Sequence, residues 1–423
     1  MTEERKSVLT EFTGEFFDEL VAGTEIGDKV RSCLQCGTCT ASCPVARYSG
    51  LSPREIVRLV LIGEEEEVLR PEVLYFCSAC YSCAVRCPMG IRLTELINLL
   101  RDVMVSRGEG PLAAQMELVK SVENYDNPWQ MPRAQRDRWA KKLPSKLKVL
   151  PKQKAEALYY PGCTAAYLPQ MQKVAGATAQ VLSAAGVDFG IMGREEICCG
   201  STAMRVGVRE TFLRQAERNI EKLNALGVER IITACAGCYG IMKHEYPKVA
   251  PFEPEVLHVS EVLAGLIEEG RLELGPVERR VTYHDPCHLA RHGGVTAPPR
   301  RVLEAIPGLQ LVEMSRTGTN ARCCGGGGGL RTGHTDSAVE VASGRQSEAL
   351  ETGAEMLVTC CPFCEMNLSD ALNAGVGLPV IDLVEVVLES LTGFAPAGES
   401  ESPAEGGRKA EPDAGDASAS DER

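Results

Sequence analysis

The chain has 423 residues, 44% of them apolar and 24% charged, which is enough for two or three packed domains. A net charge of -13, with only two Trp and nine Phe, argues against nucleic acid as a partner, because nucleic acid favours basic surfaces and stacking aromatic rings. No stretch approaches the ~18 apolar residues of a membrane span, and no apolar segment follows the charged start. We expect a globular cytoplasmic protein with no direct membrane span.

Nineteen cysteines are the most unusual part of the composition. In a secreted chain they would suggest disulfides, but the cytosol keeps thiols reduced and favours metal or catalytic roles. We therefore expect most of them to bind metal.

Residues 1–124 are predicted to form a helical domain. An amphipathic pattern predicts a helix over residues 8–21, and apolar residues at helical spacing predict another over 91–105. Between them, Ser52 is a suitable N-cap, followed by Pro53 and the acidic Glu55 in the first turn, which predicts a helix from there to about Val68. These helices surround two cysteine runs.

The two runs have the same spacing, Cys-x-x-Cys-x-x-Cys-x-x-x-Cys-Pro, which is that of bacterial ferredoxins. In that arrangement the fourth cysteine of each run ligates the other cluster. Zinc is the alternative, but a closed tetrahedral zinc site does not call for two such runs with a proline after each. We predict two 4Fe-4S cubane clusters, one held by Cys33, Cys36, Cys39 and Cys87, the other by Cys43, Cys77, Cys80 and Cys83.

Residues 125–155 are predicted to link this domain to the rest of the chain. They contain several prolines and nine Lys or Arg against two Asp. With Trp129 and Trp139 the segment could dock an acidic or membrane-bound partner, or it could be a solvated connector.

From residue 156 onward, short apolar runs alternate with helical patterns, which indicates α/β structure. Strands are expected at 158–160, 230–233, 281–284 and 356–359, and a helix at 174–185. We place one α/β domain at 156–275 and a second at 276–394. The fold class is thus α+β overall, a helical ferredoxin-like domain followed by two tandem α/β domains, and we expect the acidic tail at 395–423 to be disordered.

Each α/β domain carries the same five-cysteine pattern, with equivalent members offset by 124 to 126 residues. The first set is Cys163, Cys198, Cys199, Cys235 and Cys238, and the second set is Cys287, Cys323, Cys324, Cys361 and Cys364. Five is one more than a cubane needs, and an adjacent pair could give one terminal and one bridging thiolate to a non-cubane cluster. The alternative is a cubane or zinc in each domain plus a spare thiol. Cys360 is outside the pattern and is expected to be a packing residue.

Glycines follow both adjacent cysteine pairs, as Gly200 in the first set and as a run from Gly325 to Gly329 in the second. Glycine lets the backbone approach a cluster and point N–H groups at sulfur. We therefore predict that Gly200, Gly325 and Gly326 bind a cofactor. A flexible surface loop is the alternative, and a phosphate loop is disfavoured because no Lys-Ser/Thr pair follows.

These blocks resemble the heterodisulfide reductase family, with its ferredoxin-like subunit fused to its catalytic cysteine-rich (CCG) subunit. Residues 31–90 are similar to the small subunit and 157–390 to the catalytic one. In that family each five-cysteine set binds a non-cubane 4Fe-4S cluster, and the disulfide is cleaved between the two clusters. The resemblance implies two such clusters here, with Cys199 and Cys324 as catalytic residues.

The resemblance also implies an oxidoreductase that reduces a small-molecule or protein disulfide. Reduction needs two protons, and His288, next to Cys287, could supply one or could instead orient its loop. The chain has no flavin or nicotinamide motif, so electrons would come from a flavoprotein, a hydrogenase or a membrane cytochrome subunit. Such a partner could hold the protein peripherally on the inner face of the membrane.

The same cysteine-rich domain occurs in electron-transfer subunits of membrane-linked respiratory complexes and hydroxy-acid (glycolate or lactate) oxidases. That is the alternative function. Many of those relatives have an incomplete set in one repeat, whereas both sets here are complete. Two complete sets favour the disulfide reductase.

Overall fold

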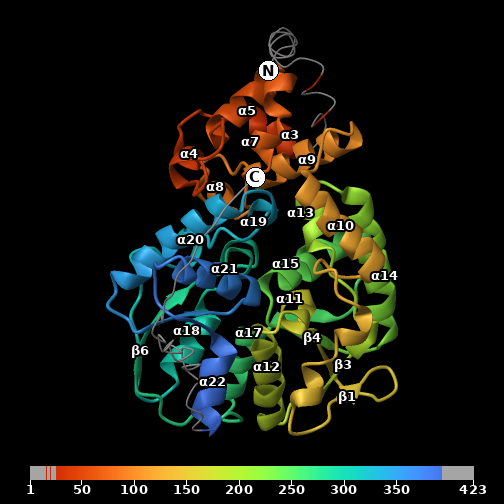
Figure 1. The fold of residues 1–423 in the computed structure, drawn as a ribbon, viewed down its shortest axis with the longest axis vertical. Coiled ribbons are helices and arrows are strands. Elements are labelled where there is room, and N and C mark those ends of the chain that lie inside the picture. Colours follow the sequence, from red (N-terminus) through yellow and green to blue (C-terminus); the bar gives the residue numbers. More distant parts are fainter. Residues whose placement is uncertain (1–15, 17–19, 21–24, 393–423) are drawn as a thin grey trace, which may run out of the picture.

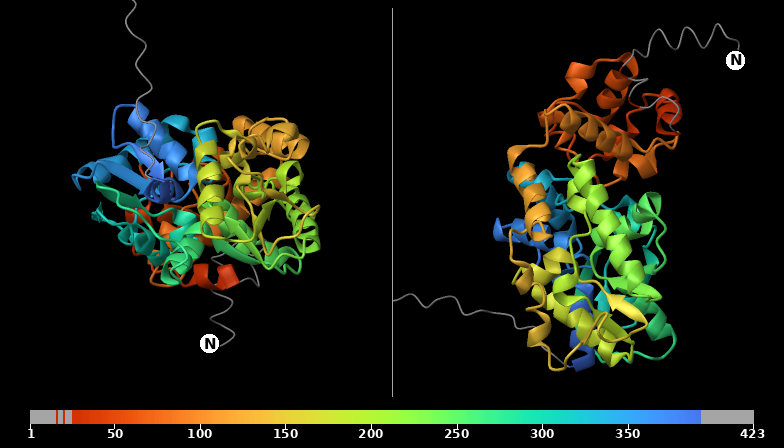
Figure 2. Two further views of the ribbon diagram at one scale, coloured as in Figure 1. Left: turned by 90° about the horizontal axis from the view of Figure 1, so that it is seen from below. Right: turned by 90° about the vertical axis from the view of Figure 1, so that its right-hand side faces the viewer.

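The computed structural model describes Phe16, Leu20 and residues 25–392 of the chain. The helix predicted over residues 8–21 and the tail at 395–423 lie outside the described residues, apart from the two single positions. A helical domain lies across the ends of two α/β lobes, which stand side by side (Figures 1 and 2). The expected α+β class is confirmed.

The helical domain contains eight of the described helices. They are α3 (Glu25–Arg31), α4 (Thr38–Ser42), α5 (Pro53–Ile62), α6 (Glu65–Val68), α7 (Pro71–Leu74), α8 (Ser82–Arg86), α9 (Leu93–Ser106) and α10 (Ala113–Tyr125). The helix predicted over 91–105 is confirmed as α9. Two short helices, α4 and α8, each carry the third cysteine of a run.

Helix α5 begins as predicted but ends early. The Ser52 hydroxyl accepts the N–H of Glu55, whose carboxylate accepts the N–H of Ser52 in return, which is a capping box. Gly63 then adopts a left-handed conformation, with φ 78°, and ends the helix. The prediction of one helix as far as Val68 was therefore wrong, because the last residues form the separate helix α6.

The two α/β domains each contain an all-parallel sheet. In the first sheet the order is β1-β3-β2-β4-β5, and in the second it is β7-β6-β8-β9. The strands are β1 (Lys148–Val149), β2 (Ala157–Tyr159), β3 (Phe189–Ile191), β4 (Arg230–Thr233), β5 (Glu255–His258), β6 (Arg279–His284), β7 (Leu309–Leu311), β8 (Met356–Thr359) and β9 (Val380–Asp382). Apart from the extra edge strand β1, the two orders are equivalent, as expected of an internal duplication.

Helices cover both sheets and join the two lobes. In the first domain they are α11 (Gly162–Tyr167), α12 (Gln172–Ala184), α13 (Ser201–Arg205), α14 (Arg209–Ala225), α15 (Ala236–His244), α16 (Tyr246–Val249) and α17 (Val259–Glu268). In the second they are the π-helix η4 (His288–His292), α18 (Ala297–Glu304), α19 (Leu330–Gly333), α20 (Thr335–Leu350), α21 (Pro362–Asn373) and α22 (Leu383–Thr392). Helix α12 packs on α22 and α17 on α18, so the lobes share one apolar core.

One arginine joins all three domains. Arg101 in α9 is fully buried, and its guanidinium donates to the carbonyls of Leu74 and Cys77 in the helical domain. It also donates to the carbonyls of Arg205 in the first lobe and Gly328 in the second, the latter at 3.0 Å. A buried charge satisfied by carbonyls from three domains fixes their mutual positions.

The segment at 125–155 packs closely against the first lobe. Trp139 is 3% exposed and lies edge-on to Tyr159, and strand β1 extends the first sheet. Arg136, 1% exposed, pairs with Glu196. The segment is therefore packed on the first lobe and is not a solvated connector. The burial of Trp139 leaves its ring unavailable to a docking partner.

Candidate functional site

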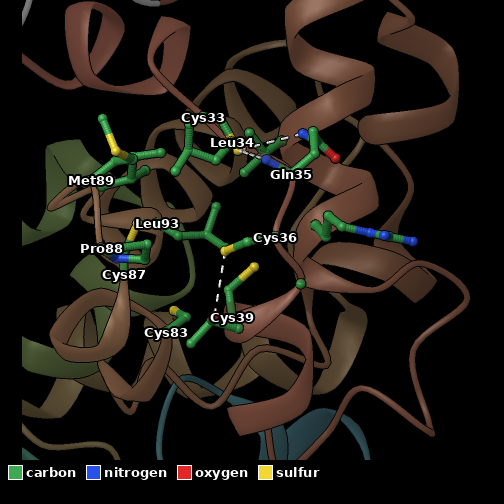
Figure 3. Close-up of a pocket in the computed structure, with 15 residues that line it drawn as sticks. Cys33, Leu34, Gln35, Cys36, Cys39, Cys83, Cys87, Pro88, Met89 and Leu93 are labelled. Carbon is green, nitrogen blue, oxygen red and sulfur yellow. Dashed lines mark hydrogen bonds between the residues drawn. The ribbon is translucent and has the colours of Figure 1, made fainter.

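The first predicted cubane set lines one pocket of the helical domain. Cys33, Cys36, Cys39 and Cys87 all face it, and Cys83 lies at its edge (Figure 3). Gln35 has a positive φ of 52°, and its backbone N–H donates to the sulfur of Cys33 at 3.4 Å. Four thiols with an N–H group directed at sulfur form a donor set that suits an iron–sulfur cluster.

The second predicted set lines a neighbouring pocket. Its four cysteines are Cys43, Cys77, Cys80 and Cys83. The turn after Cys77 repeats the first site, because Ala79 has a φ of 51° and its N–H donates to the Cys77 sulfur at 3.4 Å. Cys43 thus faces the three cysteines of the other run, as the fourth-cysteine exchange predicts.

Cysteines from both lobes converge on a single cavity of about 190 Å³. It lies where the strands of both sheets end, which is the usual ligand site of open α/β folds. Nine of the ten line it, namely Cys163, Cys198, Cys199, Cys235, Cys238, Cys287, Cys324, Cys361 and Cys364. Sequence spacing predicted each set but not that both would share one cavity.

Contacts between thiols connect the sets in a definite order. Cys80 of the helical domain interacts with Cys323, the member of the second lobe's set that lies outside the cavity lining. Cys361 of the same set interacts with Cys235 of the first lobe. The thiol contacts therefore run from the helical domain to the second set and from there to the first set.

The adjacent cysteines of each pair differ chemically. A hydrogen bond from Cys198 lowers the pKa of Cys199 to about 5, and Cys323 likewise lowers the pKa of Cys324 well below its usual range. In both lobes the second member is thus the better thiolate, a property that a cluster ligand needs.

The glycine after each pair places its N–H at the sulfur of the first member. The N–H of Gly200 lies 3.4 Å from the Cys198 sulfur, and that of Gly325 lies 3.3 Å from Cys323. Both glycines have positive φ, as an L side chain at these turns would be strained. Further along the run, Gly328 lies against the backbone of Cys77 and Ser78, so the run also seats the second lobe on the helical domain.

His288 lines the cavity, and its Nε2 lies 3.1 Å from the carbonyl oxygen of Ala79. Burial lowers the pKa of His288 to about 3, so the ring is neutral near pH 7 and Nε2–H donates to that carbonyl. This geometry favours the loop-orienting role of His288 over the role of proton donor. Cys360 is fully buried and its thiol contacts the Tyr283 hydroxyl at 2.7 Å, as expected of a packing residue.

Several cavity residues carried no signal in the sequence. Arg205 is 2% exposed and lines the cavity; one nitrogen donates to the Tyr81 hydroxyl, while Nε and the other terminal nitrogen have no partner among the described residues. Trp129 also lines it, and Arg136 lies 3.5 Å from the sulfur of Cys163. They come from separate segments without a motif, so only the fold brings them together.

Comparisons with known proteins agree with this arrangement. The 4Fe-4S dicluster domain family matches residues 29–91, and the cysteine-rich domain family, CCG, matches residues 157–243 and 281–369. The chain is 38% identical to a subunit of the dihydromethanophenazine:CoB--CoM heterodisulfide reductase of Methanosarcina mazei, over 85% of this chain and 93% of that protein. It belongs to the heterodisulfide reductase family.

Other matches are broader. The chain is 30% identical to the EtfAB:quinone oxidoreductase of Syntrophomonas wolfei, over 85% of this chain and 58% of that protein. A crystal structure of a hypothetical protein from Helicobacter pylori shares the fold, with a TM-score of 0.57 and 11% identity over 92% of this chain and 75% of that one.

Family membership confirms the resemblance inferred from the cysteine patterns. The chain is an iron–sulfur oxidoreductase that carries 4Fe-4S clusters, and the CCG domains of heterodisulfide reductases hold the non-cubane type. Within the part of the chain that the structure describes, no helix has the length and apolar character needed to cross a membrane.

Proposed function

We propose that this protein reduces a disulfide to two thiols in the cavity between its CCG domains, with electrons supplied by a partner subunit. The observation that supports this function best is that nine of the ten cysteines of the two sets line one cavity. A disulfide has two sulfurs, and a cavity with a set of thiolate ligands on each side offers each sulfur its own site. The reaction takes up two electrons and two protons and breaks one S–S bond.

We propose the cysteine assignments predicted above for the clusters, two cubanes in the helical domain and one non-cubane cluster at each five-cysteine set. When bound, such clusters supply and accept single electrons. The residues of the chain hold them, exclude water and orient the substrate. The proximity of Cys80 to Cys323 supports electron delivery to the second lobe first.

Arg205 is the residue most suited to orient the substrate. Two of its guanidinium nitrogens are buried beside the cavity without a partner among the described residues, and an unpaired buried cation is costly. An anionic group on the substrate would satisfy it, with the hydroxyls of Ser201 and Thr202 on the same wall. The substrate we propose is therefore a disulfide with an anionic group.

The electron donor is a separate subunit. The sequence has no flavin or nicotinamide motif, and the Methanosarcina mazei relative is by name a subunit of its reductase. We propose a flavoprotein, hydrogenase or membrane cytochrome subunit that docks near Cys36, the one exposed cysteine in the described part of the chain. Such a subunit would hold the protein peripherally at the inner face of the membrane.

The function is tested by anaerobic oxidation of reduced viologen by the iron-loaded protein with a panel of anionic and neutral disulfides. We expect turnover that is lost in Cys199→Ala and Cys324→Ala variants and that is faster with the anionic disulfides. The similarity to a quinone oxidoreductase makes electron transfer to a quinone the second candidate. Full iron content with quinone reduction but no disulfide turnover would replace the first proposal with the second.

A further inference from the structure

One of the differences between the two lobes lies beside their cysteine sets, at equivalent positions of the duplication. His284 ends strand β6 three residues before Cys287, and Tyr160 follows strand β2 three residues before Cys163. Both side chains are fully buried. The two residues occupy equivalent positions of the duplicated fold, and the two sites differ in the chemistry of these side chains.

In the first lobe the polar atom is directed away from sulfur. The Tyr160 hydroxyl donates to the carbonyl oxygen of Ile197. That bond uses its only proton, so it can donate nothing to the cysteines of the first set.

In the second lobe the polar atom faces sulfur. A ring nitrogen of His284 and the sulfurs of Cys324 and Cys364 all lie within 4.8 Å of one another, and all three residues are buried. Nε2 of His284 has no partner among the described residues. A buried N–H group without a partner, next to two ligand sulfurs, calls for an acceptor there.

Arg345 decides which nitrogen of His284 carries the proton. Its Nε–H donates to Nδ1 of His284 at 3.2 Å, and Glu348 holds the guanidinium at 2.7 Å. Arginine has no acceptor, so Nδ1 must be the unprotonated nitrogen and Nε2 must carry the hydrogen. A protonated Nε2 has no lone pair for iron, which leaves it the role of hydrogen-bond donor.

We propose that His284 donates a hydrogen bond through Nε2–H to a cysteine sulfur of the second set, and so raises the reduction potential of a cluster bound there. Hydrogen bonds to ligand sulfurs stabilise the reduced, more negative state. The nearness of His284 also helps to lower the pKa of the Cys324 thiol, after the larger effects of Cys323 and Cys364. The inference rests on cluster binding at the two sets, and not on the identity of the substrate.

The consequence is a direction for electrons inside the molecule. The second set contacts Cys80 of the helical domain, and it contacts the first set through Cys361 and Cys235. The contact with Cys80 makes the second set the first acceptor, and the higher potential that His284 gives it favours that step. His284 is in this sense a positioning residue, because it acts on the cluster site through the cysteine sulfurs.

The test is an EPR-monitored redox titration of iron-loaded protein with dye mediators and no disulfide. A Cys199→Ala background isolates the second set, and a Cys324→Ala background isolates the first. We expect His284→Phe to make reduction of the second set about tenfold less favourable, a fall of about 59 mV for one electron. We expect a smaller fall for His284→Gln, which keeps an N–H donor, and no change of the first set with Tyr160→Phe.

An unchanged midpoint in His284→Phe, or an equal shift of the first set in Tyr160→Phe, would overturn the inference. A strongly coupled nitrogen in pulsed EPR of the parent protein, lost in His284→Phe, would make His284 a ligand and also overturn it. If His284→Phe does not assemble the second cluster, the midpoint potential is measured in His284→Gln instead. Loss of the cluster in that variant too would mean that His284 is a cluster ligand, and would overturn the inference. A midpoint shift without disulfide turnover would contradict only the proposed function, and turnover without a shift only this inference.

Discussion

The two CCG lobes have the same strand order and the same five-cysteine set, yet their surroundings differ. After the adjacent cysteines the first lobe continues Gly-Ser-Thr-Ala, whereas the second continues with five glycines. Those glycines let the second lobe approach the backbone of Cys77 and Ser78 in the helical domain. The first lobe meets that domain through a single glycine, Gly207, which lies against the backbone of Arg101, and beside it a cavity is lined by charged side chains that include Asp102 and Arg209.

The comparison shows that duplication kept the ligand sets and changed the contacts around them. The lobe with the glycine run is the one whose cysteines touch the helical domain, through Cys80 and Cys323. The two cluster sites, equivalent in the duplication, therefore receive electrons from the helical domain one after the other. Three experiments can break or sharpen this difference.

The largest effect is expected from the adjacent cysteine pairs. Cys324→Ala should abolish the non-cubane signature of the second lobe. It should also reduce disulfide turnover to background, because the variant loses one of the two sites for the substrate sulfurs and the first acceptor of electrons from the helical domain. Cys199→Ala, the matched variant, should also stop turnover but leave the second-lobe signal reducible. Mössbauer and EPR spectra of both variants are the measurement. Loss of the two ferredoxin-type cubane signals in either variant would contradict the division into separate cluster modules.

The next effect concerns the glycine run. Gly328 has a φ of +64°, and an added Cβ would overlap the carbonyl oxygen of Cys77. Gly328→Ala should therefore lower the free energy of unfolding by about 4 kcal/mol or more, since strain and a backbone clash combine. Gly294→Ala is the control, because Gly294 has a similar φ of +72° with open space around it, and should cost only about 1 kcal/mol.

Chemical denaturation followed by circular dichroism measures both glycine variants. If Gly328→Ala is no less stable than Gly294→Ala, the close approach of the second lobe to the helical domain is not required for folding. Gly328→Ala should also slow electron transfer from viologen to the disulfide, since it displaces Cys77 relative to the second lobe.

The smallest effect is a pH dependence at the boundary with the first lobe. Burial raises the pKa of Asp102 to about 7, with a smaller opposing effect of Arg209. Because the folded state holds this proton more tightly than the unfolded state, the contribution to stability is present below about pH 4 and is lost as the pH rises to about 7. Asp102→Asn should remove that loss, on the order of 2 kcal/mol between pH 4 and 8.

Thermal unfolding of Asp102→Asn and the parent protein from pH 4 to 8 is the measurement. Asp28→Asn, which changes an exposed acid of the same domain, is the control and should leave the pH profile unchanged. A parallel profile for Asp102→Asn would show that the boundary with the first lobe does not titrate, and would reduce the contrast between the lobes to the glycine run.

The sequence alone determined the ligand types, the two ferredoxin runs, the duplication and the α/β alternation, because these depend on spacing along a few neighbouring residues. Even the start of helix α5 was predictable from Ser52 and Pro53, whereas its end required the left-handed conformation of Gly63. The family followed from the same local patterns.

Only the tertiary structure decided that cysteines of both sets line one cavity, that Cys80 meets Cys323, and that Arg205 is left without a full set of partners among the described residues. It also placed a ring nitrogen of His284 beside two cysteine sulfurs, whereas Tyr160 donates to a carbonyl. These contacts join residues up to hundreds of positions apart, and a hydrogen bond depends on direction within a few tenths of an ångström. Local spacing carries the identity of a ligand, but the packing of three domains sets which groups the ligand meets.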